Sequence, residues 1–478
     1  MLFPSESNLE RSSELRINER KSKFFCCFVV LLVECCLVGC FVVWLQIVVR
    51  SNQKTKQQNN KITKKSYLCS SNLSKPTKQT AMIMQNTTKR IHYALIMFML
   101  FATITTAQAK ETEFSINHGP YLQEVTQEGV TIVFTTTHKA HSWVELKKHD
   151  EPVTSAVRHY NTHDGLKEAW NTFSAIRIEG LQPATPYDYR IVTKEITKFQ
   201  PYHVQYGDST ATAWHTFTTT DPDQKGATLF VTSDTHFDSA KLENLLKAAD
   251  YTTCDAIFYA GDMTSYIDRA EAPFEAFIDV SVKHFASSKP FDVVRGNHET
   301  RGNLARQYPH YFPRKDGHIY GSRLIGDVMV VMLDCGEDKQ DTHPVYAGLT
   351  DFDAYRSQEA QWLKSVVKSP EYKKAKYRVI ISHFPMVMGQ EWKDEKAWYG
   401  WDDAIRKFLP ILNGTKVDLM VSGHTHRTHL HKAGADGNDF PVLEQGYDTA
   451  VRIKLDQGKI DYTIFGVDGP HGDTIRLK

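Results

Sequence analysis

The stretch ATLFVTSDTH, residues 227–236, runs from an uninterrupted apolar segment directly into an aspartate and a histidine. A short apolar run bounded by polar residues is typical of a strand that is buried on both faces. Runs of the same kind recur further along the chain, at residues 255–260, 291–295, 327–333, 377–382 and 417–422. Together they predict a sheet with a buried interior.

Helical patterns separate several of these expected strands. Apolar residues recur at helical spacing in residues 240–251, 272–285, 359–369 and 402–412. Because strands alternate with helices, we predict an α/β domain over residues 227–478.

Polar side chains follow five of the six expected strands. In open α/β sheets, ligands bind beyond the carboxyl ends of the strands, so we expect these side chains to meet at one rim. They are Asp234, His236, Asp262, Asn297, His298, His383, His424 and His426. The ordered set is more specific than any of its fragments, and it predicts a ligand site at the strand ends.

The segment before this domain has a different pattern. Between residues 113 and 220, short runs rich in threonine, valine, isoleucine and aromatic residues are separated by polar turns, a pattern that predicts a β-sandwich. The runs are residues 129–137, 142–148, 171–181, 186–196 and 212–220. The segment DPDQKG, residues 221–226, reads as a linker.

The motifs DTH, GD, GNHE, HFP and GHTH resemble those of the calcineurin-like metallophosphoesterase superfamily, in which they occur in this order. LQPATPYDYR, residues 181–190, resembles a fibronectin type III pattern, and residues 117–137 look like the N-terminal domain of purple acid phosphatases. The overall resemblance is to exported bacterial metallophosphatases. It implies a multidomain protein, with an all-β fibronectin III-like sandwich before a four-layer α/β domain of two mixed β-sheets flanked by helices.

The resemblance also implies two divalent or mixed-valence metal ions. The first would be held by Asp234, His236, Asp262 and His426. The second would be held by Asp262, Asn297, His383 and His424, with Asp262 bridging both. Oxygen and imidazole ligands without cysteine suit Mn, Fe or Zn rather than Ca.

The implied reaction is hydrolysis of a phosphate ester, with a hydroxide between the metals as nucleophile and His298 protonating the leaving alcohol. A phosphorylated small molecule is the expected substrate, and a monoester is favoured. Arg301, and more weakly Arg295, are candidates for contacting phosphate, although an exposed loop arginine is an equally good interpretation. The alternatives are a phosphodiesterase or nuclease on the same centre, and a non-catalytic adhesion or binding protein.

The sequence departs from the purple acid phosphatases at two positions. Ser265 occupies the place of their tyrosine ligand, and His236 occurs where that branch lacks histidine. We therefore expect a colourless protein without an obligatory ferric ion.

Other conspicuous residues are assigned no catalytic role. His429 and His431 are expected on a following strand and not as ligands. Cys335, Glu337 and Asp338 could shape the substrate rim, but a solvated acidic loop is the favoured interpretation for the two acids. Cys254 and Cys335 lie in apolar segments and are expected to be buried free cysteines.

The first 110 residues contain two apolar segments. Residues 24–49 are long enough to span a bilayer. Residues 82–109 combine basic residues, an apolar stretch and Ala-Gln-Ala, the pattern of a signal peptide. We expect residues 1–81 to be an extension of the reading frame and the protein to be exported, periplasmic or secreted. A membrane anchor at 24–49 is the alternative, and a lipid-modified Cys40 is discounted.

Composition sets the broad class. With 478 residues, 41% hydrophobic and 24% charged, the chain is an ordinary globular protein. Lys and Arg number 57 against 56 Asp and Glu, so the overall charge indicates no nucleic-acid partner and no acidic membrane surface.

Overall fold

The computed structural model describes residues 113–389, 392 and 398–478, which fall within one compact unit, Lys110–Lys478. In these residues no helix combines the length and the apolar character that a membrane span requires. The predicted extension, signal peptide and possible anchor lie outside them.

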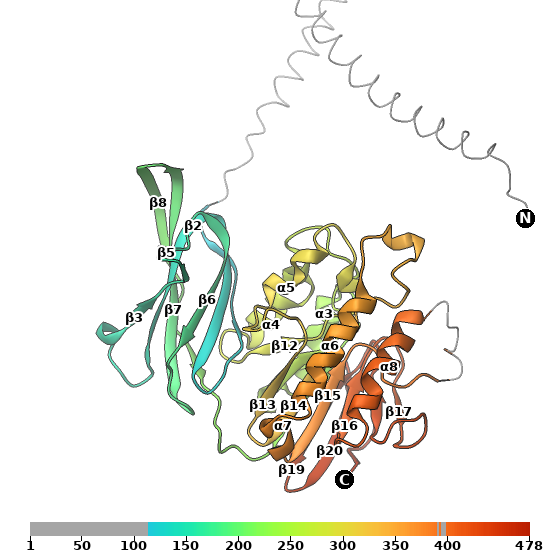
Figure 1. Ribbon diagram of the computed structural model, residues 1–478. Coiled ribbons are helices and arrows are strands. Elements are labelled where there is room, and N and C mark those ends of the chain that lie inside the picture. Colours follow the sequence, from blue (N-terminus) through green and yellow to red (C-terminus); the bar gives the residue numbers. More distant parts are fainter. Residues whose placement is uncertain (1–112, 390–391, 393–397) are drawn as a thin grey trace, which may run out of the picture. The chain divides into compact units, whose positions relative to one another are not determined.

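The first part of the described chain is all β (Figure 1). The runs expected at 129–137 and 142–148 form one long strand, β2, which a bulge between Thr135 and Ala140 divides. The first half of β2 pairs with β1 and β6, and the second half pairs with β7 and β3. The elements are β1 Ile116–Gln123, β2 Gly129–Lys148, η1 Val153–Ser155, β3 Val157–His159, β4 Thr162–His163, β5 Leu166–Lys167, β6 Asn171–Glu179, β7 Pro186–Gln200, β8 His203–Ala211 and β9 His215–Thr218.

The α/β part contains two mixed sheets. The first has the order β12-β11-β10-β19-β20-β21, with β22 on β20, and the second has the order β13-β14-β15-β16-β18-β17. The strands are β10 Ala227–Thr232, β11 Ala256–Tyr259, β12 Phe291–Val293, β13 Gly321–Ile325, β14 Val328–Leu333, β15 Tyr377–Ser382, β16 Leu419–Ser422, β17 His429–His431, β18 Val442–Glu444, β19 Ala450–Asp456, β20 Lys459–Gly466, β21 Gly469–Pro470 and β22 Ile475–Arg476.

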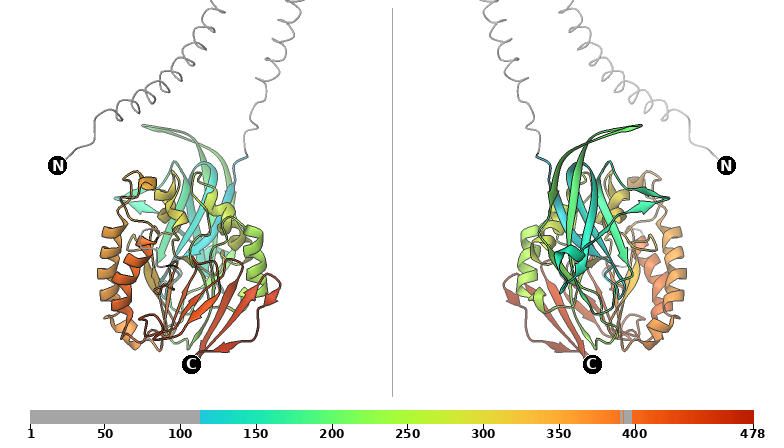
Figure 2. Two further views of the ribbon diagram at one scale, coloured as in Figure 1. Left: turned by 90° about the vertical axis from the view of Figure 1, so that its right-hand side faces the viewer. Right: turned by 90° about the vertical axis from the view of Figure 1, so that its left-hand side faces the viewer.

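Helices cover the outer faces of the sheets (Figure 2). The segment expected to be one helix at 272–285 is a π-helical turn, η3, that continues into α4. The helices are α3 Ser239–Ala248, η2 Tyr251–Thr253, η3 Phe274–Ile278, α4 Asp279–His284, η4 His298–Thr300, η5 Ala305–Gln307, α5 Tyr308–Tyr311, η6 Pro344–Tyr346, α6 Phe352–Val366, α7 Pro370–Lys374 and α8 Tyr399–Leu412.

Alternating side chains on each strand join these layers. On β10, Leu229 and Val231 pack in the core between the two sheets, whereas Phe230 packs with residues of α3. On β14, Val330 lies in the core between the sheets and Val331 packs with α6 and α8 on the other side. Because neighbouring residues of a strand point to opposite faces, both sheets are buried on both sides. The predicted α/β architecture of two mixed sheets between helices is confirmed.

The β region contacts the α/β region through β1. Tyr121 is fully buried in the core that contains Phe274, and its hydroxyl donates to the carbonyl of Tyr311 at 2.7 Å. The amide of Leu122 donates to the carbonyl of Ala286 at 2.9 Å. These contacts lie in a shared apolar core, so the two regions stabilise each other.

Candidate metal centre

The predicted ligands come from five strand ends that divide between the two sheets. β10, β11 and β12 of the first sheet precede Asp234, Asp262 and Asn297, whereas β15 and β16 of the second precede His383 and His424. The ligands therefore do not share the rim of a single sheet. They meet where the carboxyl ends of both sheets come together.

Several of these residues have an unusual backbone conformation. Positive φ angles are uncommon outside glycine and cluster at functional sites, where surrounding structure must hold them. They occur at Asp234 (56°), His236 (47°), Asp262 (53°), His424 (72°) and His426 (58°). These residues follow β10, β11 and β16, so the chain turns sharply after three of the five strands.

The first group of candidate ligands is Asp234, His236 and His426, whose ligand atoms all lie within 4.8 Å of one another. Asp234 is fully buried, and its Oδ1 has no hydrogen-bond partner, although His426 Nε2 lies 3.3 Å away without the alignment of a hydrogen bond. Buried carboxylate oxygens are nearly always satisfied. A buried oxygen without a hydrogen bond, beside the His426 imidazole, fits a cation as a further partner.

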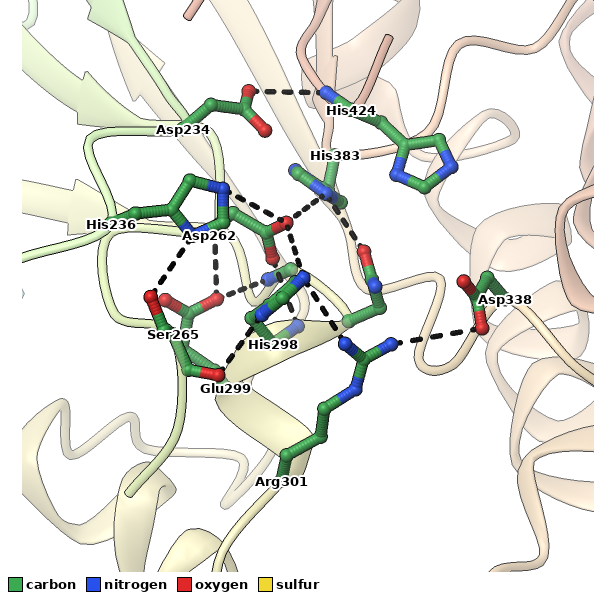
Figure 3. Close-up of polar contacts among 12 residues, drawn as sticks. Asp234, His236, Asp262, Ser265, His298, Glu299, Arg301, Asp338, His383 and His424 are labelled. Atoms are coloured by element: carbon green, nitrogen blue, oxygen red, sulfur yellow. Dashed lines mark hydrogen bonds and ion pairs between the residues drawn. The ribbon is translucent and has the colours of Figure 1, made fainter. Parts of the chain in front are cut away.

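The second group is Asp262, His383 and His424, again within 4.8 Å. His383 Nδ1 donates to the carbonyl of Ala260 at 2.9 Å, so Nε2 faces Asp262 Oδ2 at 3.2 Å and Asn297 Oδ1 at 3.1 Å. A backbone carbonyl on the far nitrogen is the usual way in which a metal-binding histidine is oriented. All seven predicted ligands therefore converge, as Figure 3 shows for most of them, and the donor set fits two metal ions. Their assignment as ligands stays a prediction.

The charges of the centre are strongly coupled. Burial acts to lower the pKa of His383, but the Asp262 carboxylate raises it to about 10. Burial and the positive charge of His383 lower the pKa of His424 to about 3. Burial acts to raise the pKa of Asp262, yet His383 holds it well below its usual range. The lowered pKa favours the neutral form of His424, which is the form of histidine that binds a metal.

His298 forms a third group of possible ligands with His236 and Asp262, and its ligand atom also lies within 4.8 Å of theirs. Its Nδ1 donates to the carbonyl of Ser265 at 2.9 Å, and its amide donates to Asp262 Oδ1 at 2.9 Å. Nε2 is then the nitrogen that faces the centre, 3.9 Å from Asp262 Oδ2. The ring is held in one orientation, with Nε2 turned toward Asp262 and Arg301.

Arg301 reaches the same nitrogen from the opposite direction (Figure 3). Its Nη1 lies 3.1 Å from His298 Nε2, and its other nitrogens bind Glu337 at 3.0 and 3.1 Å. Arg295 instead pairs with buried Asp334 at 2.7 Å, away from the centre. Of the two arginines that the sequence singles out, Arg301 is the one within reach of a bound phosphate.

Glu299 is a structural residue that the motif contains but that sequence reasoning gave no role. It is completely buried and accepts hydrogen bonds from the amides of Asp262 and Thr264 at 2.8 Å and of Gly296 at 2.9 Å. Burial and the nearby Asp262 charge raise its pKa to about 7. Glu299 therefore ties the loops after β11 and β12 together. Its place directly after Asn297 and His298 was the available signal.

Two glycines permit close approach at the centre. A Cβ at Gly296 would overlap the Asp262 carboxylate and amide, and a Cβ at Gly423 would overlap Asp234 Oδ2 and Ser233 Oγ. Any side chain at these positions would push a candidate ligand away.

The acidic segment after β14 differs from the favoured expectation. Glu337 and Asp338 are buried, with 1% and 5% of their surface exposed, so they are not part of a solvated loop. Arg301 neutralises Glu337, and Lys339 pairs with Asp338 at 2.7 Å. The two acids can be buried because Arg301, from another loop, and Lys339, the next residue of the same loop, neutralise them. Glu337 and Lys339 line a cavity together with Arg301.

The remaining histidines and cysteines lie outside the centre. His429 and His431 are on β17, and His431 Nε2 pairs with Glu444 Oε1 at 2.7 Å. Neither occurs in the clusters of potential ligands found in the described residues. Cys254 and Cys335 are buried and free, as predicted.

The comparisons with known proteins agree with this geometry. Residues 227–428 match the family model of the calcineurin-like phosphoesterases. Purple acid phosphatase 18 of Arabidopsis thaliana is 22% identical over 192 residues, which are 38% of this chain and 39% of that protein. The chain therefore matches well under half the length of this curated relative.

Solved structures show the same fold. The purple acid phosphatase PPD1 from yellow lupin (Lupinus luteus) seeds has a TM-score of 0.56 at 14% identity, over 75% of this chain and 73% of that one. The structure of PhoD has a TM-score of 0.50 at 12% identity, over 76% of this chain and 90% of that one. Because the sequences are only 14% and 12% identical, the similarity shows a shared fold. The function has to be argued from the residues of the site.

Proposed function

We propose, on the premise that residues 227–428 belong to the calcineurin-like phosphoesterase superfamily, that this protein hydrolyses phosphate monoesters of small molecules with a dinuclear metal centre. The observation that carries the proposal is the convergence of two groups of candidate ligands. Asp234 has a buried oxygen without a hydrogen bond. Asp262 lies between His236 and His383, where it could bind both metal ions. Mn, Fe and Zn are the metals that suit these ligands.

The protein's own residues have distinct tasks in this reaction. Two bound metal ions would supply Lewis-acid polarisation of the phosphoryl oxygens and activation of water at neutral pH. His298, held through Nδ1, would take up a proton at Nε2 once Arg301 turns from that nitrogen to a phosphoryl oxygen, and would pass this proton to the leaving oxygen. Arg301, beside that nitrogen, would donate to a phosphoryl oxygen and orient the ester.

The β region and the export of the protein are further parts of the proposal. We infer that the β region is a fibronectin III-like module. The amide of Gln182 donates to the hydroxyl of Tyr187 at 3.0 Å, the short backbone contact that marks a tyrosine corner in such sandwiches. Export, in periplasmic or secreted form, rests on the sequence alone. N-terminal sequencing of the mature protein checks it, and a start before Lys110 would count against it.

A pair of substrates tests the proposed reaction. We expect the metal-loaded protein to hydrolyse p-nitrophenyl phosphate with a higher kcat/KM than bis(p-nitrophenyl) phosphate. A large preference for the diester would favour the phosphodiesterase alternative. Absence of hydrolysis of both by fully metal-loaded protein would favour a binding protein.

A further inference from the structure

A cavity of about 490 Å³ adjoins the candidate metal centre, and Arg301 belongs to both. The segment around η4 and η5 forms one wall with Arg301 and Arg306, and the loop from Glu337 to Thr350 forms the other. Small-molecule sites commonly have this volume. A cavity in this position is therefore large enough for the organic part of a substrate.

Arg301 connects the cavity to the centre, because it lines the cavity and contacts His298. One edge of its guanidinium faces His298 Nε2 at 3.1 Å, and the other binds Glu337 within the cavity wall. If His298 protonates the leaving oxygen, the leaving alcohol emerges beside Arg301. The cavity is then the space that this alcohol enters.

The carboxylate in the wall is already neutralised. Glu337 accepts hydrogen bonds from Arg301, from Thr300 Oγ1 at 2.7 Å and from the hydroxyl of Tyr346 at 2.9 Å. Lys339, which also lines the cavity, pairs with Asp338. These four charges form two pairs, so they leave little net field in the cavity.

Arg306 is different because its charge is not paired. Its one hydrogen bond within the described part of the chain runs from Nη2 to the carbonyl of Leu349 at 3.1 Å, and no carboxylate in that part forms an ion pair with it. Its side chain is exposed and lines the cavity. It presents the remaining guanidinium donors and a full positive charge to whatever fills the cavity.

The other lining groups suit an organic anion. His343 Nδ1 accepts from the amide of Val345 at 3.3 Å, so its other nitrogen carries the hydrogen and can donate. Val345 and Leu349 line the cavity with 67% and 68% of their surfaces exposed. They offer apolar contact to a carbon skeleton at the mouth.

We propose that this cavity receives the leaving alcohol of the substrate and that Arg306 binds a second anionic group on it, a carboxylate or a phosphate. The inference rests on the proposed phosphomonoesterase function and narrows its substrate class to doubly anionic organic phosphates. Arg306 is then a specificity-determining residue, because it touches the part of the substrate that does not react.

Three aryl substrates test this proposal with the metal-loaded full-length protein. Phenyl phosphate lacks a second anion, 4-carboxyphenyl phosphate carries a carboxylate, and 1,4-phenylene bisphosphate carries a second phosphate. We expect kcat/KM to exceed that of phenyl phosphate by about tenfold to a hundredfold for at least one doubly anionic substrate, through a lower KM, as for a charge-assisted hydrogen bond. Whichever of the two doubly anionic substrates shows the larger increase in kcat/KM identifies the second anion as a carboxylate or a phosphate.

Variants assign the preference to Arg306. Arg306→Gln should abolish the preference, lowering kcat/KM for the doubly anionic substrates far more than for phenyl phosphate, and Arg306→Lys should retain part of it. Arg452→Gln is the control, because Arg452, like Arg306, donates to a backbone carbonyl, that of Ala249 at 3.0 Å, and does not line the cavity. Equal kcat/KM for all three substrates in the wild type, or a preference that survives in Arg306→Gln, would overturn the inference and leave the phosphomonoesterase proposal standing. Failure to hydrolyse any of the three would overturn both.

Discussion

Ser265 supports two histidines of the centre at once. Its carbonyl accepts from His298 Nδ1 at 2.9 Å, and its hydroxyl lies 3.4 Å from His236 Nδ1. The outer nitrogen of each ring is therefore held by one residue, and Nε2 of each ring faces Asp262. A small residue at this position orients two imidazoles without itself entering the centre.

Replacing His298 should remove proton transfer but not metal binding. We expect His298→Ala to lower kcat for phenyl phosphate by about 10²–10⁴-fold, the range for loss of a general acid, with metal content unchanged. Kinetics and metal analysis of the purified protein check this. His203→Ala, at an exposed histidine of β8, is the control. Wild-type turnover in His298→Ala would exclude the assigned role.

Removing metal should lower both activity and stability. Without metal, the buried carboxylates of Asp234 and Asp262 would lose the cations that we propose as their partners. A metal ion at a hundredfold excess over its Kd stabilises the folded state by about 2.7 kcal/mol, and its removal takes this stabilisation away. We expect chelation to abolish hydrolysis and reduce Tm, and one or more of Mn, Fe and Zn to restore both. An unchanged Tm and full activity in chelated, metal-free protein would contradict the dinuclear centre.

The native protein should be colourless and should not require a ferric ion. Position 265 carries serine, and the neighbouring Tyr266 is 49% exposed with its ring packed against Phe237 at 5.9 Å. No phenolate is therefore aimed at the first ligand group from this loop. An absorption spectrum recorded with a parallel iron determination checks the prediction, and a strong visible band would refute it.

Substituting Glu299 should weaken the connection between the two loops that carry Asp262 and Asn297. In the native protein both oxygens of the Glu299 carboxylate accept hydrogen bonds from backbone N–H groups. In Glu299→Gln one of these oxygens is replaced by an NH₂ group, which cannot accept them. Each buried N–H group left without a partner costs about 1–3 kcal/mol of stability. We expect lower stability to urea and weaker metal binding. Glu371→Gln, at an exposed position of α7, should change neither. Unaltered stability and metal affinity in Glu299→Gln would show that the loops hold without it.

The pair of His431 and Glu444 should make stability depend on pH. The hydrogen bond to Glu444 raises the pKa of His431 above its usual value, against the effect of burial, and Asp436 lies 3.0 Å from its other nitrogen. The pKa of His431 is higher in the folded protein than in the unfolded chain, where it is about 6.5. The stabilisation from the charged His431–Glu444 pair is therefore complete below that unfolded-state pKa. It is lost as the pH rises through the higher pKa of the folded protein.

His431→Gln measures this contribution. We expect its free energy of unfolding in urea to fall below that of the wild type by roughly 1.5–3 kcal/mol at pH 5.5, as for a hydrogen bond to a charged group, and by less at pH 9. His429→Gln, at the exposed neighbour on β17, should show a smaller difference. A deficit that is the same at both pH values would mean that the charge of His431 contributes nothing.

Local pattern was sufficient to place Asp262, Asn297 and His424 at strand ends. Apolar runs become buried strands wherever they pack, and the polar residues after them must then lie at the ends, so these positions follow from the chain alone. The same reasoning failed for Glu337, because its burial depends on Arg301 from a distant loop. The local pattern also predicted two strands where the structure has the single strand β2, because the polar residues between Thr135 and Ala140 look like a turn.

The sequence by itself determined which donors the site contains and in what order they occur, because strand periodicity and the turns after strands are local properties. Only the tertiary structure decided that β10–β12 and β15–β16 belong to different sheets whose ends meet at Asp262, and that Arg306 faces a cavity beside His298. Those features depend on the pairing and packing of segments far apart in the chain. Backbone hydrogen bonds and apolar burial select such partners together, and no short stretch of sequence records them.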